Sequence, residues 1–200
     1  MKTKKRTIQF VVILIVILTF ASSAQAFTRT DRNTLVVNYA NTWWNARNSA
    51  YRSFDSDCAN FVSQCLNQVI SENSNWTRGH KVLGLWYGTS ASWSVANSLR
   101  SYLINNLSSD TSGAFFVRSQ YSYTCSPSIT STNGNVGIGS SVFYDWEGDG
   151  TYNHSSIGTG AGTIAQHTTD RSSSTPWSLY THLTAAQKVT TKYSVVNVDS

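Results

Sequence analysis

Three cysteines and four histidines are the residues of this sequence best suited to nucleophilic chemistry. A thiolate attacks carbonyl carbons, and it needs a base, most often histidine, to take the thiol proton. Cys58 stands out because the sequence predicts a helix over residues 57–70, with Ser56 and Asp57 as its capping residues. Unpaired N–H groups and the positive end of the helix dipole stabilise a thiolate in a first turn. We therefore expect Cys58 to be a nucleophile with a lowered pKa; the alternative is an inert, packed thiol.

The other two cysteines have no such position. Cys65 lies seven residues after Cys58, on the apolar face of the same predicted helix, which favours packing or a disulfide over chemistry. A disulfide with Cys125 is permitted in an exported protein. It requires Cα atoms within ~7 Å, which the sequence leaves open.

Two histidines lie where a base for Cys58 is expected. Residues 155–160 and 163–168 predict a hairpin that turns at Ala161-Gly162. In a regular hairpin with a two-residue turn, His154 and His167 share one face, so His167 is expected to orient the base His154. A single bulge in the hairpin would put Gln166 in the place of His167. The alternative is that both histidines are ordinary surface residues of a strand.

Three segments resemble the bacterial "putative amidase domain" family, which belongs with the CHAP and NlpC-like branch of papain-like enzymes. Residues 57–64, DCANFVSQ, are similar to the family motif DCxNFxSQ. Residues 142–154 resemble its strand, acidic turn and catalytic histidine, and residues 166–171, QHTTDR, resemble its closing segment. Departures are Ser140-Ser141, where relatives carry Gly-Asp, and Ser155-Ser156, where they carry an apolar pair.

The resemblance implies a role for each matching position. Cys58 is the nucleophile, and His154 is the general base and then the general acid. His167 is the third catalytic group, with Gln166 as the alternative. Backbone N–H groups near Cys58 would form the oxyanion hole, because such donors stabilise developing negative charge.

The order of the predicted elements indicates the fold class. Residues 31–47, 57–70 and 93–103 carry apolar residues at helical spacing. From residue 114 onward the chain is rich in Val, Ile, Phe, Tyr and Thr, interrupted by Gly, Asn and Ser, which is typical of strands and turns. Helices followed by an antiparallel sheet define an α+β order. With the resemblance, this predicts a papain-like cysteine hydrolase whose N-terminal helices pack on an antiparallel β-sheet.

The N-terminus predicts a secretory signal. Four basic residues precede an apolar run over residues 8–20, and Ala24-Gln25-Ala26 matches an A-x-A cleavage site. The run falls short of the ~20 residues of a membrane span. We expect a signal peptide over residues 1–26, one domain over residues 27–200, and no stable membrane insertion after cleavage. The mature protein would be secreted, extracellular or associated with the cell wall; the alternative is an uncleaved anchor.

Composition limits the partners. Four of the 15 lysines and arginines lie in the signal, which leaves 11 basic against 10 acidic residues, and nucleic-acid binding needs clustered basic residues. A polar, sparsely charged chain with seven tryptophans and ten tyrosines suits a carbohydrate-rich ligand. Residues 145–150 imitate the start of a calcium loop, but Ser156 stands where the closing Glu belongs. We expect no nucleic acid, no metal and no cofactor.

The expected function is a secreted, monomeric cysteine amidase or peptidase that hydrolyses amide bonds in peptidoglycan or a related peptide. The same residues would serve a secreted peptidase or deamidase that acts on proteins. A third alternative is a non-catalytic module that binds the cell wall.

Overall fold

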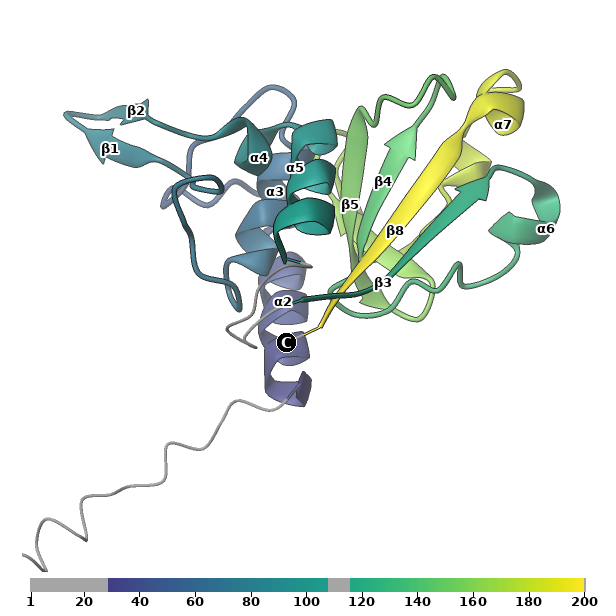
Figure 1. The fold of residues 1–200 in the computed structure, drawn as a ribbon, viewed down its shortest axis with the longest axis horizontal. Helices are drawn as coiled ribbons and strands as arrows, with labels where there is room; N and C mark the ends of the chain where they lie inside the picture. The colour runs from purple at the N-terminus through teal and green to yellow at the C-terminus, as the bar shows by residue number, and fades with distance from the viewer. Residues whose placement is uncertain (1–28, 108–115, 200) are drawn as a thin grey trace, which may run out of the picture.

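A computed structural model describes residues 29–107 and 116–199. The expected signal peptide lies outside the described residues. Within them, helices cover one face of a six-stranded sheet (Figure 1), and every neighbouring pair of strands is antiparallel. The predicted α+β class with an antiparallel sheet is therefore confirmed. No described helix is both long enough and apolar enough to cross a bilayer.

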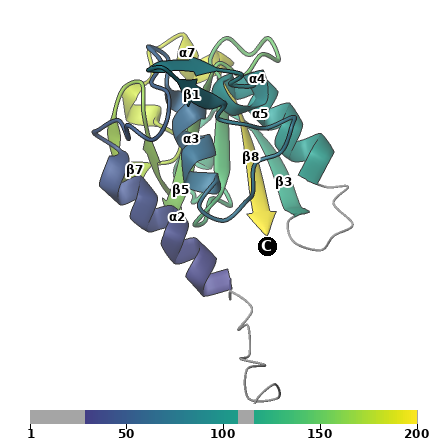
Figure 2. The same ribbon diagram turned by 90° about the vertical axis from the view of Figure 1, so that its left-hand side faces the viewer.

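The helical layer comes first in the chain. It consists of α2 (Arg29–Trp43), α3 (Cys58–Leu66), α4 (Ala91–Ser94), α5 (Ala96–Tyr102) and a π-helical turn, η1 (Leu103–Leu107). The expected helix over residues 93–103 is interrupted at Val95, whose backbone is extended. A short hairpin, β1 (His80–Val82) and β2 (Leu85–Tyr87), projects from this layer (Figure 1). Figure 2 shows α3 in the middle of the layer, over β5 and between α2 and α5.

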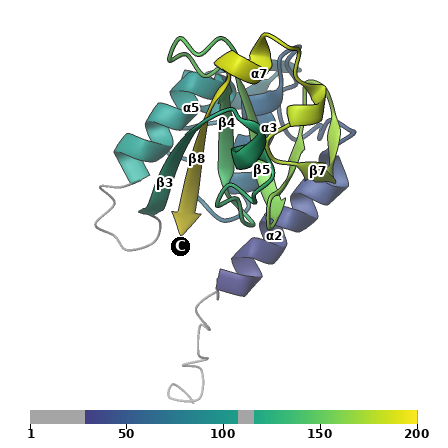
Figure 3. The same cartoon turned by 90° about the vertical axis from the view of Figure 1, so that its right-hand side faces the viewer.

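The sheet has the strand order β3-β8-β4-β5-β6-β7. Its strands are β3 (Phe116–Thr124), β4 (Ser141–Asp145), β5 (His154–Gly160), β6 (Thr163–Gln166), β7 (Arg171–Pro176) and β8 (Lys192–Asp199). The face away from the helical layer carries α6 (Pro127–Thr130), α7 (Gln187–Thr190) and a 3-10 turn, η2 (Tyr180–His182) (Figure 3). The polar sequence of β7, RSSSTP, lacks the apolar alternation that would predict a strand.

The sheet separates two hydrophobic cores. Successive strand residues point to opposite faces, so Phe143 and Ile157 pack towards the helices, whereas Tyr144 and Ile164 pack on the other face around Trp177. All five side chains are buried. Each face of the central strands is therefore covered, and a polar side chain there needs a specific partner.

The β5–β6 hairpin contains a bulge. Gly160 pairs with Thr163, but Gly158 pairs with Ile164, so Thr159 is an extra residue on β5. The extra residue shifts the pairing by one position. As a result Gln166, and not His167, shares the face of His154. This is the irregularity that the sequence left open.

Candidate active site

Cys58 is the first residue of α3, and its thiol is buried. The sulfur lies beside the backbone N–H and the hydroxyl of Ser155, and beside the backbone N–H of Ala59. These donors lower the pKa of the thiol, but burial raises it more, so the net shift is upward. The prediction that the helix terminus lowers the pKa of Cys58 is therefore wrong. Desolvation raises this pKa by more than the N–H groups lower it. At neutral pH the thiol is protonated.

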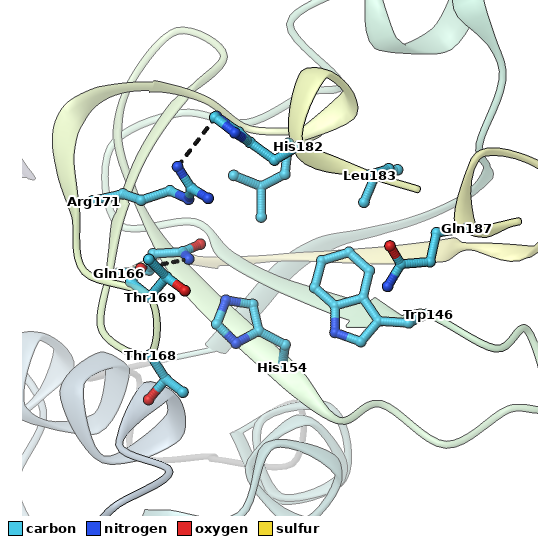
Figure 4. Close-up of a pocket in the computed structure, with 10 residues that line it drawn as sticks. Trp146, His154, Gln166, Thr168, Thr169, Arg171, His182, Leu183 and Gln187 are labelled. Atoms are coloured by element: carbon cyan, nitrogen blue, oxygen red, sulfur yellow. Dashed lines mark hydrogen bonds between the residues drawn. The ribbon is translucent and has the colours of Figure 1, made fainter. Parts of the chain in front are cut away.

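His154 is the first residue of β5 and projects from the face of the second core. Its ring lies 5.3 Å from that of Tyr144 and 5.7 Å from that of Trp146, measured between centroids. The ring borders a cavity of about 240 Å³ that Gln166 and Arg171 also line (Figure 4). Burial lowers the pKa of His154 to about 4, Gln166 opposes this shift, and the charge of Arg171 adds to it. The imidazole is therefore neutral at neutral pH.

Gln166 is the polar group next to the imidazole (Figure 4). Its Nε2 donates to the carbonyl of Thr169 at 2.9 Å. Its Oε1 and the Nε2 of His154 are both buried without a hydrogen-bond partner. A hydrogen bond from His154 Nε2–H to Gln166 Oε1 would satisfy both atoms and fix the tautomer of the ring. Unsatisfied buried polar atoms are uncommon in folded proteins and mark sites worth explaining by function.

His167 has different neighbours. Its Nδ1 lies 2.6 Å from Asp57 Oδ2, its Nε2 lies 2.7 Å from the carbonyl oxygen of Trp43, and its ring stacks on Phe61 at 4.0 Å. Both ring nitrogens therefore face acceptor oxygens, which hold the ring between the end of α2 and the start of α3. The hairpin bulge turns His167 towards α3 and away from the face of His154. The position expected for His167 is thus occupied by Gln166.

Cys58 lies near the start of β5, the strand whose first residue is His154. The sulfur lies beside Ser155, the residue that follows His154. Asp57, which precedes Cys58, donates its backbone N–H to Thr168 Oγ1 at 2.8 Å, and Thr168 lines the same cavity as His154. No hydrogen bond joins the thiol and the imidazole of these two residues in this structure. Ser155 and His154 are successive residues of β5, so their side chains project from opposite faces of the strand.

A buried charge network holds the start of α3 in place. Asp57 is the residue before the helix, but its carboxylate does not cap the helix. Its Oδ1 accepts from the N–H of Phe54 at 3.0 Å, and its Oδ2 lies 3.3 Å from Arg47 Nε. Arg47 also forms a bidentate pair with Asp170 at 2.9 and 3.1 Å. Sequence reasoning missed Arg47, because no local pattern links it to residues more than a hundred positions away.

Two other expectations concern bound metal and disulfides. The carboxylate of Asp145 accepts the N–H groups of Gly148, Asp149 and Gly150 at 2.7, 3.1 and 2.8 Å, so it closes a turn in the segment that imitates a calcium loop. Within residues 29–107 and 116–199, no group of three or more His, Cys, Asp or Glu is arranged to hold a metal ion. Cys65 and Cys125 are free thiols buried in the two separate cores.

Comparison with known proteins assigns the family. Residues 30–193 match the family described as "Putative amidase domain", and the chain belongs to this family. Membership indicates hydrolysis of amide bonds. A Bacillus subtilis (strain 168) relative, "Uncharacterized protein YhbB", is 36% identical over 126 residues, which make up 60% of this chain and 34% of the relative. The chain thus spans about a third of the length of that protein. No solved structure shows a significant match.

Proposed function

We propose that this protein is a secreted cysteine amidase or peptidase of the papain-like type that hydrolyses amide bonds in peptidoglycan. The observation that carries the proposal is the position of the Cys58 thiol, in the first turn of α3 and beside the residue that follows His154. Gln166, rather than His167, serves as the third group. The DCANFVSQ motif around Cys58 and membership in the amidase family support the same chemistry.

The reaction starts from two neutral groups. As the sulfur attacks the amide carbon, His154 takes the thiol proton, and the carbonyl π electrons move to oxygen. The N–H groups at the first turn of α3 then donate to this oxyanion. His154 gives its proton to the leaving nitrogen, the C–N bond breaks, and an acyl-enzyme thioester remains. A water molecule, deprotonated by His154, attacks the thioester, and Cys58 regains its proton when the carboxylic acid leaves.

Gln166 acts on the charged form of the base. When His154 takes the proton from sulfur, its imidazolium donates from Nε2 to the unoccupied Oε1 of Gln166. This hydrogen bond favours the charged ring and opposes the lowering of its pKa by burial. The strong desolvation of both groups means that the ion pair of thiolate and imidazolium forms together with the attack, not before it.

The substrate and the location are inferred from the sequence. The predicted signal over residues 1–26 favours export, and an exported amidase meets peptidoglycan, whose stem peptides and cross-links are amides. When the full chain is expressed in a bacterium, the exported protein should begin at Phe27 on N-terminal sequencing. Recovery of only a membrane-bound protein that retains residue 1 would contradict the export proposal.

The catalytic proposal is tested with Cys58→Ala on purified sacculi. We expect the wild-type domain to release soluble muropeptides, measured by mass spectrometry, and Cys58→Ala to lower the rate by at least about a thousandfold, because a nucleophile of this kind acts as a unit with its base. Cys65→Ala is the matched control: it removes a second buried thiol from the same helix and should keep nearly full activity. Equal release by wild type and Cys58→Ala would refute the proposal.

Two other results would support a different function. Cleavage of protein substrates with none of sacculi would indicate the peptidase or deamidase function. Co-sedimentation with sacculi, together with equal inertness of wild type and Cys58→Ala, would indicate a binding module.

A further inference from the structure

Arg171 lines the cavity beside His154, and the catalytic proposal gives it no role. It is the first residue of β7 and pairs directly with Gln166 across the β6–β7 register. His154, Gln166 and Arg171 therefore come from three consecutive strands, and Figure 4 shows the three side chains around one cavity. In this cavity, Gln166 lies between the guanidinium group of Arg171 and the imidazole of His154 (Figure 4).

The guanidinium has no carboxylate partner in the part of the chain that the structure describes. Its Nη1 donates to His182 Nε2 at 3.2 Å, and its Nε is buried without a hydrogen-bond partner. Among the described residues, no acidic side chain forms an ion pair with Arg171, and none lines the cavity. In contrast, Arg47 and Arg78 are both paired with carboxylates. The charge of Arg171 also acts on the base, because it lowers the pKa of His154.

The shape of the cavity limits what could neutralise this charge. About 240 Å³ lies below the ~300–1,000 Å³ of pockets for drug-sized ligands, so the cavity suits a single amino-acid residue. Trp146 and Leu183 supply apolar walls, and Gln187 adds an amide (Figure 4). A guanidinium group binds a carboxylate through parallel N–H donors, and the match is both strong and directional.

We propose that Arg171, supported by His182, binds a free carboxylate of the substrate, so that the enzyme acts on amides whose neighbouring amino-acid residue carries an unblocked carboxyl group. This inference rests on the proposed function, because it requires a substrate that reaches from the cavity, which His154 lines, to the Cys58 sulfur. Arg171 is then a specificity determinant: it holds one end of the substrate and takes no part in proton transfer.

The test uses two matched alkylating probes, N-bromoacetylalanine and N-bromoacetylalaninamide, each as both enantiomers. The Cys58 sulfur displaces bromide from either probe, and the probes differ only in carboxylate against carboxamide. The ratio of the two rate constants at Cys58, assigned by peptide mapping, should fall about tenfold or more in Arg171→Gln, as expected for loss of a charge-assisted hydrogen bond. The rate with the carboxamide serves as the reference, because it absorbs any change that the loss of the Arg171 charge makes to His154 and hence to Cys58. Arg171→Lys should retain part of the preference, because it keeps the charge without the planar fork.

Lys81→Gln is the control for total charge, since Lys81 lies on the β1–β2 hairpin and does not line the cavity. Its rate ratio should equal that of the wild type. An unchanged ratio in Arg171→Gln would overturn the inference and leave the proposed function standing. Absence of labelling at Cys58 with both probes in the wild type would instead count against the proposed function.

A second measurement does not depend on thiol reactivity. N-acetylalanine at millimolar concentration should raise the Tm of Cys58→Ala, and N-acetylalaninamide should not, because a ligand stabilises only the folded state that binds it. The Tm shift should vanish in the double variant with Arg171→Gln. Equal shifts with and without Arg171 would reject the carboxylate site whatever the outcome of the labelling.

Discussion

His154 is an ionisable residue kept almost entirely out of water, and this has a measurable effect on stability. Its pKa is about 4 in the folded protein against 6.5 for a free histidine, chiefly because of burial. Between these values the unfolded chain binds a proton that the folded protein excludes. Stability is therefore complete above pH 6.5 and falls as the pH drops towards 4, by roughly 3 kcal/mol.

This pH effect can be isolated with His154→Gln, which removes the titrating group and keeps a polar side chain of similar reach. Urea unfolding at pH 7.5 and at pH 4.5 should show a smaller loss of unfolding free energy in the variant than in the wild type. The comparison removes the contribution of the other histidines, which both proteins share. Identical losses would mean that His154 is not buried as a neutral ring.

At the residue scale, the sequence indicated candidate residues but not their contacts. The motif around Cys58 and the histidine after the acidic turn made Cys58 and His154 the candidates. The choice between Gln166 and His167 depended on one extra residue, Thr159, in the hairpin. A bulge has no strong signature in a segment of Gly, Ser and Thr, so periodicity alone selected the wrong face. The QHTTDR segment contains Arg171, but the sequence could not show that no acidic side chain of the described residues pairs with it.

At the scale of elements, the start of α3 is held by charge as well as by packing. The Asp57 carboxylate is fully buried and contacts the Arg47 guanidinium and the His167 ring. The network joins α3 to the end of α2 and to the β6–β7 connection. The negative charge next to Cys58 therefore lies beside the positive charge of Arg47.

Asp57→Asn should be strongly destabilising, because it breaks the pair with Arg47 and puts an amide in place of the fully buried carboxylate that also contacts His167. Removal of one member of a buried ion pair typically costs about 3–5 kcal/mol, and the shift should appear as a lower midpoint in urea unfolding. Asp55→Asn is the matched control: Asp55 is two residues away and exposed, so its variant should differ by less than about 0.5 kcal/mol. Equal, small effects of both changes would show that the network does not stabilise the fold.

The elements with an apolar pattern or a clear turn signal were predicted. Helix α3 and strands β4 and β8 carry apolar patterns, since one or both of their faces are buried, whereas the hairpin of β5 and β6 was predicted from its Ala161-Gly162 turn. The β1–β2 hairpin is largely exposed and β7 is polar, so neither has a hydrophobic pattern to detect. The missed strand β7 is the one that brings Arg171 into the cavity.

At the scale of the whole molecule, the sheet has a hydrophobic core on each face, and the proposed site lies at one end of the sheet. Cys58 comes from the helical side, and His154 points into the other side. The proposed reaction between them therefore requires both layers to keep their positions on the sheet. This arrangement predicts that the two cores unfold together, because neither layer can leave without exposing the strands that the other covers.

Two substitutions on neighbouring strands test this coupling. Ile157 on β5 packs in the helical core and Ile164 on β6 packs in the opposite core, and both are fully buried. Ile157→Ala and Ile164→Ala should each cost about 2–5 kcal/mol. In both variants, urea unfolding followed by tryptophan fluorescence and by far-UV circular dichroism should give one shared midpoint. If one change lowers the midpoint of only one signal, the cores unfold independently. The site would then depend on the docking of two separately stable layers.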